Sequence, residues 1–283
     1  MNIPLNVDLA GKVAVITGAG GILCSDFAKA IAKCGASVAL LDINYDAANA
    51  YAKEIEAEGG KAIAVKANCL EKASLEAAYA EVTEKLGKCD ILINGAGGNN
   101  PRATTANEYF DIEALENPEI QDFFSLSADG FKFVFDLNVT AAFLTTQVFA
   151  RDMAVAGSGN IINISSMNAF RPLTKIPAYS AAKSAVSNFT QWLAVHFAGT
   201  GIRVNAIAPG FFVSNQNRAL LYNPDGTPTA RTHKILSGTP MRRFGDASEL
   251  LGGLLFLLSD AAAGFITGVV LPIDGGFSAY SGV

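Results

Sequence analysis

The chain has few cysteines, and their pattern argues against both disulfides and a metal site. Cys24, Cys34, Cys69 and Cys89 form no C-x-x-C pair and have no histidine nearby, so we expect reduced, mostly buried thiols of a cytoplasmic protein. Basic residues are also in the minority, with 21 Lys and Arg against 26 Asp and Glu. This balance argues against nucleic acid or an anionic membrane surface as the main partner.

Long uninterrupted apolar runs are missing as well. The most apolar stretch, Leu250 to Ile273, contains Asp260 and several glycines, so it is not expected to span a membrane. Met1–Ala10 lacks the basic start of a secretory leader. Because 50% of the 283 residues are hydrophobic, we expect one large domain, residues 1–283, with an extensive core.

Short β-branched runs alternate with helical patterns through most of the sequence. This alternation predicts an α/β fold with a doubly wound, Rossmann-type parallel sheet flanked by helices. Strands are expected at Lys12–Thr17, Ser37–Asp42, Ala62–Lys66, Asp90–Ile93, Asn160–Ile164, Arg203–Ala208 and Val269–Pro272. Helices are expected at Ser25–Lys33, Ala47–Glu58, Ser74–Leu86, about Phe131 to Ala156, Pro177–Phe197 and Ser248–Ser259.

Two polar segments interrupt the alternation, at Gly98–Gly130 and Phe211–Arg243. Long loops in compact domains are usually lids or binding elements. Both segments follow strand ends, where ligands bind in open α/β sheets, so we interpret them as substrate-loop insertions.

Residues typical of nucleotide binding follow the first, second and fourth strands. Thr17-Gly-Ala-Gly-Gly-Ile-Leu-Cys24 joins a strand to a helix, where glycines let the backbone approach a pyrophosphate at the helix N-terminus. Asp42 ends the second strand, 24 residues after Gly18, where a carboxylate takes ribose hydroxyls and repels a 2′-phosphate. Asn94-Gly-Ala-Gly97 ends the fourth. These features predict NAD as the cofactor; ordinary strand-end turns and a surface aspartate are the alternatives.

Ser166 and Tyr179-Ser-Ala-Ala-Lys183 form a candidate reacting centre. Tyrosine and lysine four residues apart share one helix face. A cation at ~4 Å with an effective dielectric of ~20 lowers a phenol pKa by roughly three units. We therefore expect Lys183 to lower the pKa of Tyr179 and make it a general acid/base for carbonyl reduction or alcohol oxidation. An amphipathic helix face without catalytic role is the alternative.

Taken in order, these motifs together with Asn138 and Pro209-Gly210 resemble the short-chain dehydrogenase/reductase superfamily, from Lys12 to Asp274-Gly-Gly276. The resemblance implies that Tyr179 is the acid/base, that Ser166 orients the substrate oxygen, and that Lys183 holds the nicotinamide ribose. Asn138 would hold a water that links Lys183 to a proton relay, and no metal would be needed. The cofactor contacts that it implies are Gly18, Gly20, Gly21, Ile22, Asp42, Asn68, Asn94, Gly95, Ala96, Gly97, Tyr179, Lys183, Pro209, Gly210 and Ser214.

Cys24 departs from the family pattern, because it stands where the last glycine of T-G-x-x-x-G-x-G is expected. Because cysteine is small, we expect the helix packing to be preserved and the geometry of the pyrophosphate site to differ slightly. The alternative is that Cys24 is a redox-sensitive thiol.

Members of this size are commonly homotetramers. The apolar segments Leu250–Leu258 and Val269–Phe277 resemble a part that often forms an interface, so we expect a homo-oligomer.

Substrate recognition is indicated by charge and by a narrower resemblance. Phe211–Arg243 has five basic residues against Asp225, which suits a carboxylate, although solvated loop charges are the simpler interpretation residue by residue. The runs Ile93–Pro101 and Ser165–Pro177 resemble those of the D-mannonate oxidoreductases (fructuronate reductases) within this superfamily. This implies a sugar-acid substrate, with Arg102, Ser166, Asn168 and Lys175 as candidate contacts. Another sugar or gluconate-type dehydrogenase, or a non-catalytic NAD-binding sensor, is the alternative.

Overall fold

A computed structural model describes residues 6–213 and 218–282 of the protein. Its centre is one sheet of parallel strands in the order β3-β2-β1-β4-β5-β6-β7. The strands are β1 (Val13–Thr17), β2 (Ser37–Asp42), β3 (Lys61–Lys66), β4 (Ile91–Asn94), β5 (Gly159–Ile164), β6 (Ile202–Pro209) and β7 (Val270–Ile273). The predicted doubly wound sheet is confirmed, and the strand order reverses between β1 and β4, which is where such sheets bind ligands.

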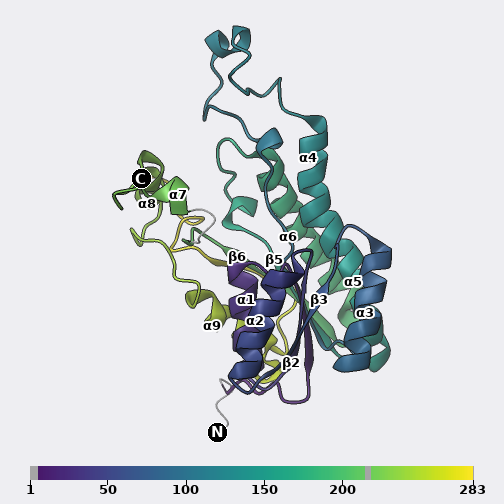
Figure 1. Ribbon diagram of the computed structural model, residues 1–283. Coiled ribbons are helices and arrows are strands. Elements are labelled where there is room, and N and C mark those ends of the chain that lie inside the picture. The colour runs from purple at the N-terminus through teal and green to yellow at the C-terminus, as the bar shows by residue number, and fades with distance from the viewer. Residues whose placement is uncertain (1–5, 214–217, 283) are drawn as a thin grey trace.

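Helices cover both faces of the sheet (Figure 1). One core cluster joins the sheet to α1, α2 and α9, and the other joins it to α3, α5 and α6. The helices are α1 (Ile22–Lys33), α2 (Tyr45–Ala57), α3 (Lys72–Lys85), α4 (Ala128–Phe135), α5 (Ala141–Ala156), α6 (Pro177–Phe197), α7 (Arg218–Leu221), α8 (Ala230–Gly238), α9 (Glu249–Leu258) and α10 (Asp260–Ala263).

The continuous helix from Ala128 to Ala156 is long and apolar enough to cross a membrane by composition alone. Its second half, α5, instead packs in the core, where Phe149 and Met153 are fully buried. A π-helical turn, Asp136–Thr140, joins α4 to α5 within it. The sequence predicts one regular helix here, so the turn is a new feature.

The two polar segments hold more structure than the sequence predicts. Gly98–Gly130 contains 3₁₀ turns at Pro101–Ala103 and Ile112–Glu116 and the start of α4, and it rises above the sheet (Figure 1). Phe211–Arg243 contains α7 and α8. Thr229 begins α8 by accepting a hydrogen bond from the Thr232 backbone, which is a capping signal that the sequence analysis misses.

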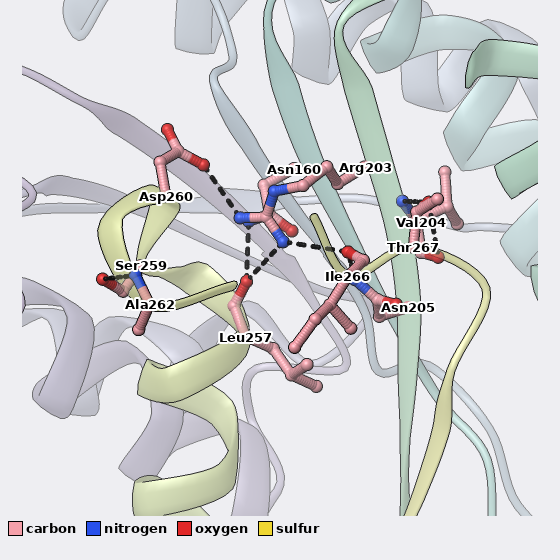
Figure 2. Close-up of polar contacts among 10 residues, drawn as sticks. All are labelled: Asn160, Arg203, Val204, Asn205, Leu257, Ser259, Asp260, Ala262, Ile266 and Thr267. Carbon is pink, nitrogen blue, oxygen red and sulfur yellow. Dashed lines mark hydrogen bonds and ion pairs between the residues drawn. The ribbon is translucent and has the colours of Figure 1, made fainter. Parts of the chain in front are cut away.

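A buried arginine fastens α9 and α10 to the start of β6 (Figure 2). Arg203 is 9% exposed, and its Nη1 donates to the backbone oxygen of Leu257, 2.9 Å away, at the end of α9. Its Nη2 pairs with Asp260 at 2.8 Å, and Nδ2 of Asn160 donates to the same Leu257 oxygen at 3.0 Å. A cation at a helix C-terminus satisfies free carbonyls and suits the helix dipole.

The substitution Arg203→Met is expected to lower the free energy of unfolding by about 2–3 kcal/mol, because charge-assisted hydrogen bonds in a buried site are lost. Urea denaturation followed by circular dichroism measures this loss. Asp260→Asn is the control, since the Asp260 side chain is 76% exposed and its ion pair contributes about 1 kcal/mol at most. Equal losses for both variants would contradict the assignment of stability to the buried carbonyl contacts.

Candidate active site and nucleotide-binding cavity

A cavity of about 620 Å³ extends along the carboxyl ends of the strands. The glycine-rich turn, Asp42, Gly95 and Gly97 form one part of its wall, and Ser166, Tyr179 and Lys183 form another. Residues after β6 and on α7 and α8 complete it, namely Pro209, Gly210, Phe211, Phe212, Leu221, Arg231 and Ile235. The structure therefore brings the predicted nucleotide-binding turn and the predicted reacting centre into one cavity.

The turn after β1 is held against the end of β4 at close range. Gly18 has φ +67°, and a Cβ atom on it would lie 2.9 Å from the backbone nitrogen of Ala96. Thr17 Oγ1 accepts from the backbone nitrogens of Gly95 and Ala96, at 3.1 and 3.2 Å. The turn then enters α1 at Gly21, which has no side-chain cap. Free N–H groups beside glycines leave room and donors for a diphosphate, so these residues fit a dinucleotide.

Asp42 lies directly beside the same turn. Its Oδ2 accepts from the backbone nitrogen of Gly20 at 2.9 Å, and its Oδ1 accepts from that of Asn44 at 2.8 Å. Each carboxylate oxygen keeps further acceptor capacity. The geometry therefore fixes the carboxylate at the cavity wall, as expected for a group that binds ribose hydroxyls.

Cys24 fills the space between α1 and the end of β4. A Cβ atom on Gly95 would lie 2.2 Å from Cys24 Sγ, so this cysteine is accommodated by a glycine opposite it. Burial raises the pKa of the Cys24 thiol to about 12, which keeps the reactive thiolate scarce. The packing interpretation is therefore supported over the redox-sensitive alternative, and all four cysteines are free thiols.

Ser166, Tyr179 and Lys183 come from two neighbouring elements. Ser166 follows β5, and its Oγ accepts from the backbone nitrogen of Asn168 at 3.2 Å, which fixes its rotamer at the start of a 3₁₀ turn. Tyr179 and Lys183 lie one turn apart on α6, with Lys183 Nζ 5.6 Å from the centre of the Tyr179 ring. Lys183 Nζ donates to the backbone oxygen of Ile164 at 2.7 Å. The three side chains thus converge at the end of β5.

The predicted depression of the Tyr179 pKa is wrong for this structure. Burial raises the pKa of the Tyr179 phenol above its ordinary value, and a hydrogen bond with Ser166 opposes that rise only in part. Burial also lowers the pKa of Lys183 to about 8. The effect that opposes burial at Tyr179 comes from Ser166, and not from the Lys183 ammonium on which the prediction depends.

Lys183 should make stability depend on pH in a specific window. The folded-state pKa of about 8 lies below the ordinary value of 10.5, so the unfolded chain binds this proton more tightly between those values. The contribution of Lys183 to the free energy of unfolding should therefore increase as the pH rises from about 8 to 10.5. Urea unfolding across this window should show a steeper rise for the wild type than for Lys183→Met, and parallel curves would contradict the buried lysine.

Asn138 lies within the π-helical turn, where a local widening directs its side chain toward the loop after β4. Its Nδ2 donates to the backbone oxygens of Gly98 and Val134, at 2.7 and 2.8 Å. Its Oδ1 accepts from the Gly98 backbone nitrogen at 3.2 Å. A Cβ atom on Gly97 would lie 2.6 Å from that Oδ1 and 3.2 Å from Lys183 Nζ. Asn138 is therefore adjacent to Lys183, and its side chain also clamps the loop.

Several predicted cofactor contacts lie elsewhere in the described structure. Asn94 is buried and donates to Thr146 and Asn163, which ties β4 to α5 and β5. Asn68 accepts from the Leu70 backbone and donates to Glu71 before α3. Within the described part of the protein, neither residue nor Ala96 is part of the cavity wall. Ser214 lies outside the described residues.

The predicted substrate contacts are also divided. Arg102 is exposed on the first 3₁₀ turn of the insertion, and Lys175, with φ +71°, lines a separate hollow with Tyr109 and Phe110. Asn168 is buried behind Ser166, and its Oδ1 has no hydrogen-bond partner among the described residues. Of the four candidates, Ser166 is in the cavity wall.

Sequence reasoning missed the wall contributed by α7 and α8. Leu221, Arg231 and Ile235 line the cavity from these helices, and Phe211 and Phe212 line it from the end of β6. Arg231 belongs to the noted basic group of this segment, but nothing in its spacing separates it from the other four cations. The Thr229 cap is the signal that could have identified the helix.

Comparison with known proteins adds one family match and three similar proteins. A family model for the short-chain dehydrogenases matches residues 12–223. A crystal structure with bound NAD, of a Haemophilus influenza protein provisionally named a D-mannonate oxidoreductase, is 58% identical, with TM-score 0.94 and 100% of both proteins covered. An uncharacterized oxidoreductase, UxuB, of Bacillus subtilis (strain 168) is 53% identical over 99% of this protein and 100% of its own length. A 7alpha-hydroxysteroid dehydrogenase of Escherichia coli (strain K12) is 34% identical over 96% of each.

Proposed function

The protein belongs to the short-chain dehydrogenase/reductase family and is an NAD-dependent oxidoreductase, and from that premise we propose that its substrate is a sugar acid, with D-fructuronate and D-mannonate as the interconverted pair. The observation that carries the proposal is the full-length similarity to the protein provisionally named a D-mannonate oxidoreductase. The steroid-specific relative at 34% identity shows that family membership alone does not fix the substrate.

The proposed chemistry uses three side chains of the cavity. Bound NAD supplies the hydride acceptor for alcohol oxidation, and its reduced form supplies the hydride for carbonyl reduction. In reduction, the Tyr179 phenol gives its proton to the substrate oxygen while the Ser166 hydroxyl donates a hydrogen bond to that oxygen. In oxidation the phenolate takes the same proton back. Lys183 would carry protons between Tyr179 and solvent, toward Tyr179 in reduction and away from it in oxidation. Asn138, which meets Lys183 around Gly97, holds the loop that borders the site.

The cavity lining also supports a hydrophilic substrate. Ser166 and Arg231 line the same cavity as Tyr179 and provide hydrogen-bond donors there. A polyhydroxylated acid can use both donors, whereas an apolar substrate would leave Arg231 unpaired.

The test is NADH oxidation by the purified protein with D-fructuronate, D-tagaturonate, 5-ketogluconate and neutral ketoses, followed by the absorbance of reduced nicotinamide. Turnover of fructuronate well above the others supports the proposal. Good turnover of a neutral ketose with none of fructuronate would contradict it, and turnover of 5-ketogluconate alone would favour the gluconate-type alternative.

We also propose that the protein is a cytoplasmic homotetramer. β7 is at the edge of the sheet, and Phe265 just before it is fully exposed, which supports an interface near the C-terminal region. A second apolar surface, with half-exposed Phe143 and Trp192 and the exposed Val195, covers α5 and α6. Light scattering that gives the mass of a monomer would contradict the tetramer.

A further inference from the structure

The basic residues between Phe211 and Arg243 have different surroundings in the structure. The Arg218 guanidinium lies over the ring of Tyr222, 5.4 Å from its centre. Arg242 donates to backbone oxygens at the end of α8. Arg243 forms a two-bonded ion pair with Glu249, at 2.7 Å for each bond. These three arginines are therefore used in holding the fold together.

Arg231 is different, because it lines the cavity that contains Ser166, Tyr179 and Lys183. It lies in the first turn of α8, which has no acidic residue to offset its charge. A cation near a helix N-terminus interacts unfavourably with the helix dipole, and an anion bound there would relieve that interaction.

α8 is held in place by an ion pair to the insertion. Lys234, three residues after Arg231 and therefore on a neighbouring part of the same helix face, donates to both carboxylate oxygens of Glu108, at 2.9 and 3.0 Å. The hydrogen bond from Lys234 lowers the pKa of Glu108, and the charges of Lys175 and Arg231 add to that effect. One carboxylate thus faces three cations.

The ion pair between Lys234 and Glu108 places α8 beside the reacting end of the cavity. Glu108 lines one hollow with Lys175 and Pro177, and the helix of Tyr179 begins at Pro177. The glycine-rich turn follows β1 and Asp42 ends β2, and both strands lie on the other side of the point where the strand order reverses. An anion bound by Arg231 would therefore be part of the substrate.

We propose that Arg231 binds the carboxylate of the sugar-acid substrate, with the Lys234–Glu108 ion pair positioning α8 for that contact; the proposal rests on the sugar-acid function proposed above. A guanidinium presents a planar pair of donors that matches a carboxylate, and such charge-assisted bonds are stronger than neutral ones. Arg231 then selects a uronate over the ketose that has a hydroxymethyl group in its place.

The first experiment compares Arg231→Gln with the wild type on D-fructuronate and on D-fructose. The KM for fructuronate should rise about 10- to 100-fold, with a small change in kcat, while the poor kcat/KM for fructose stays the same. Arg231→Lys should recover part of the loss. Arg218→Gln is the matched control, since it removes a guanidinium of the same segment that is stacked on Tyr222. An equal loss of kcat/KM on both substrates would overturn the proposal. Weaker NADH binding in a fluorescence titration would also overturn it, because Arg231 would then bind the cofactor diphosphate.

A binding measurement separates this inference from the substrate assignment. Calorimetry of D-mannonate and D-gluconate with the enzyme saturated with NADH measures binding without turnover, because neither hexonate has a ketone that accepts the hydride. If the wild type binds a hexonate and Arg231→Gln does not, the carboxylate contact is supported, even when fructuronate is not reduced. In that case only the assignment of fructuronate as the substrate is wrong. Binding that persists in Arg231→Gln, or no hexonate binding by the wild type, would overturn the role of Arg231.

Discussion

Replacement of Tyr179 by phenylalanine is expected to lower kcat by about a thousandfold while NADH binds with unchanged affinity. The substitution removes one oxygen from a buried ring and leaves the α6 packing in place. General acid/base groups contribute about 10²- to 10⁴-fold to a rate, and the phenol lines the cavity, hydrogen-bonded to Ser166 and one helical turn from Lys183. Steady-state kinetics and fluorescence titration of NADH measure the two quantities.

Tyr51→Phe is the matched control for this variant. Tyr51 is on α2, where its ring lies under the ammonium of Lys29, 4.9 Å from it, so its hydroxyl takes no part in the proposed chemistry. Unchanged kcat in that variant shows that the loss at Tyr179 is chemical. If Tyr179→Phe keeps its activity, the acid/base assignment is wrong; if the wild type binds NADH but turns over no substrate, the sensor alternative becomes the better one.

The sequence predicts best those parts whose structure depends on local pattern. β2 and α6 have the predicted limits, because β2 is a short apolar run that ends at an aspartate and α6 begins at a proline, which suits the first turn of a helix. The glycine-rich turn and Tyr179-x-x-x-Lys183 are also local, so their convergence follows once the strand order is known.

The parts that the sequence does not predict depend on distant contacts. α8 contacts the insertion through the pair between Lys234 and Glu108, which are 126 residues apart, so Arg231 could not be separated from its neighbours by spacing. The buried side-chain partners of Asn94, which are Thr146 and Asn163, come from two other elements and could not be identified by spacing, and its cofactor contact stays a prediction. The pKa error at Tyr179 has the same origin, since burial is a property of the packed protein.

Replacement of Asp42 by asparagine is expected to raise the ratio of kcat/KM with NADPH to that with NADH by about a hundredfold. A carboxylate and one phosphate charge at ~4 Å repel by about 4 kcal/mol at an effective dielectric of ~20, and salt screening in the open part of the cavity reduces that value. Asparagine keeps the size of the side chain and an oxygen that can accept from the Gly20 or Asn44 backbone, so the change is mainly one of charge.

The control separates recognition from support of the turn. Asp46→Asn removes an exposed charge from the first turn of α2 and should leave the ratio within about threefold, because a solvated charge is screened. Asp42 also has a structural contact, since a Cβ atom on Gly20 would lie 3.0 Å from its carboxylate. If Asp42→Asn weakens NADH and NADPH equally, the carboxylate acts by bracing the glycine-rich turn, and the cofactor preference must come from another part of the cavity. A selective gain with NADPH would instead show that the two backbone bonds hold the charge in place for discrimination.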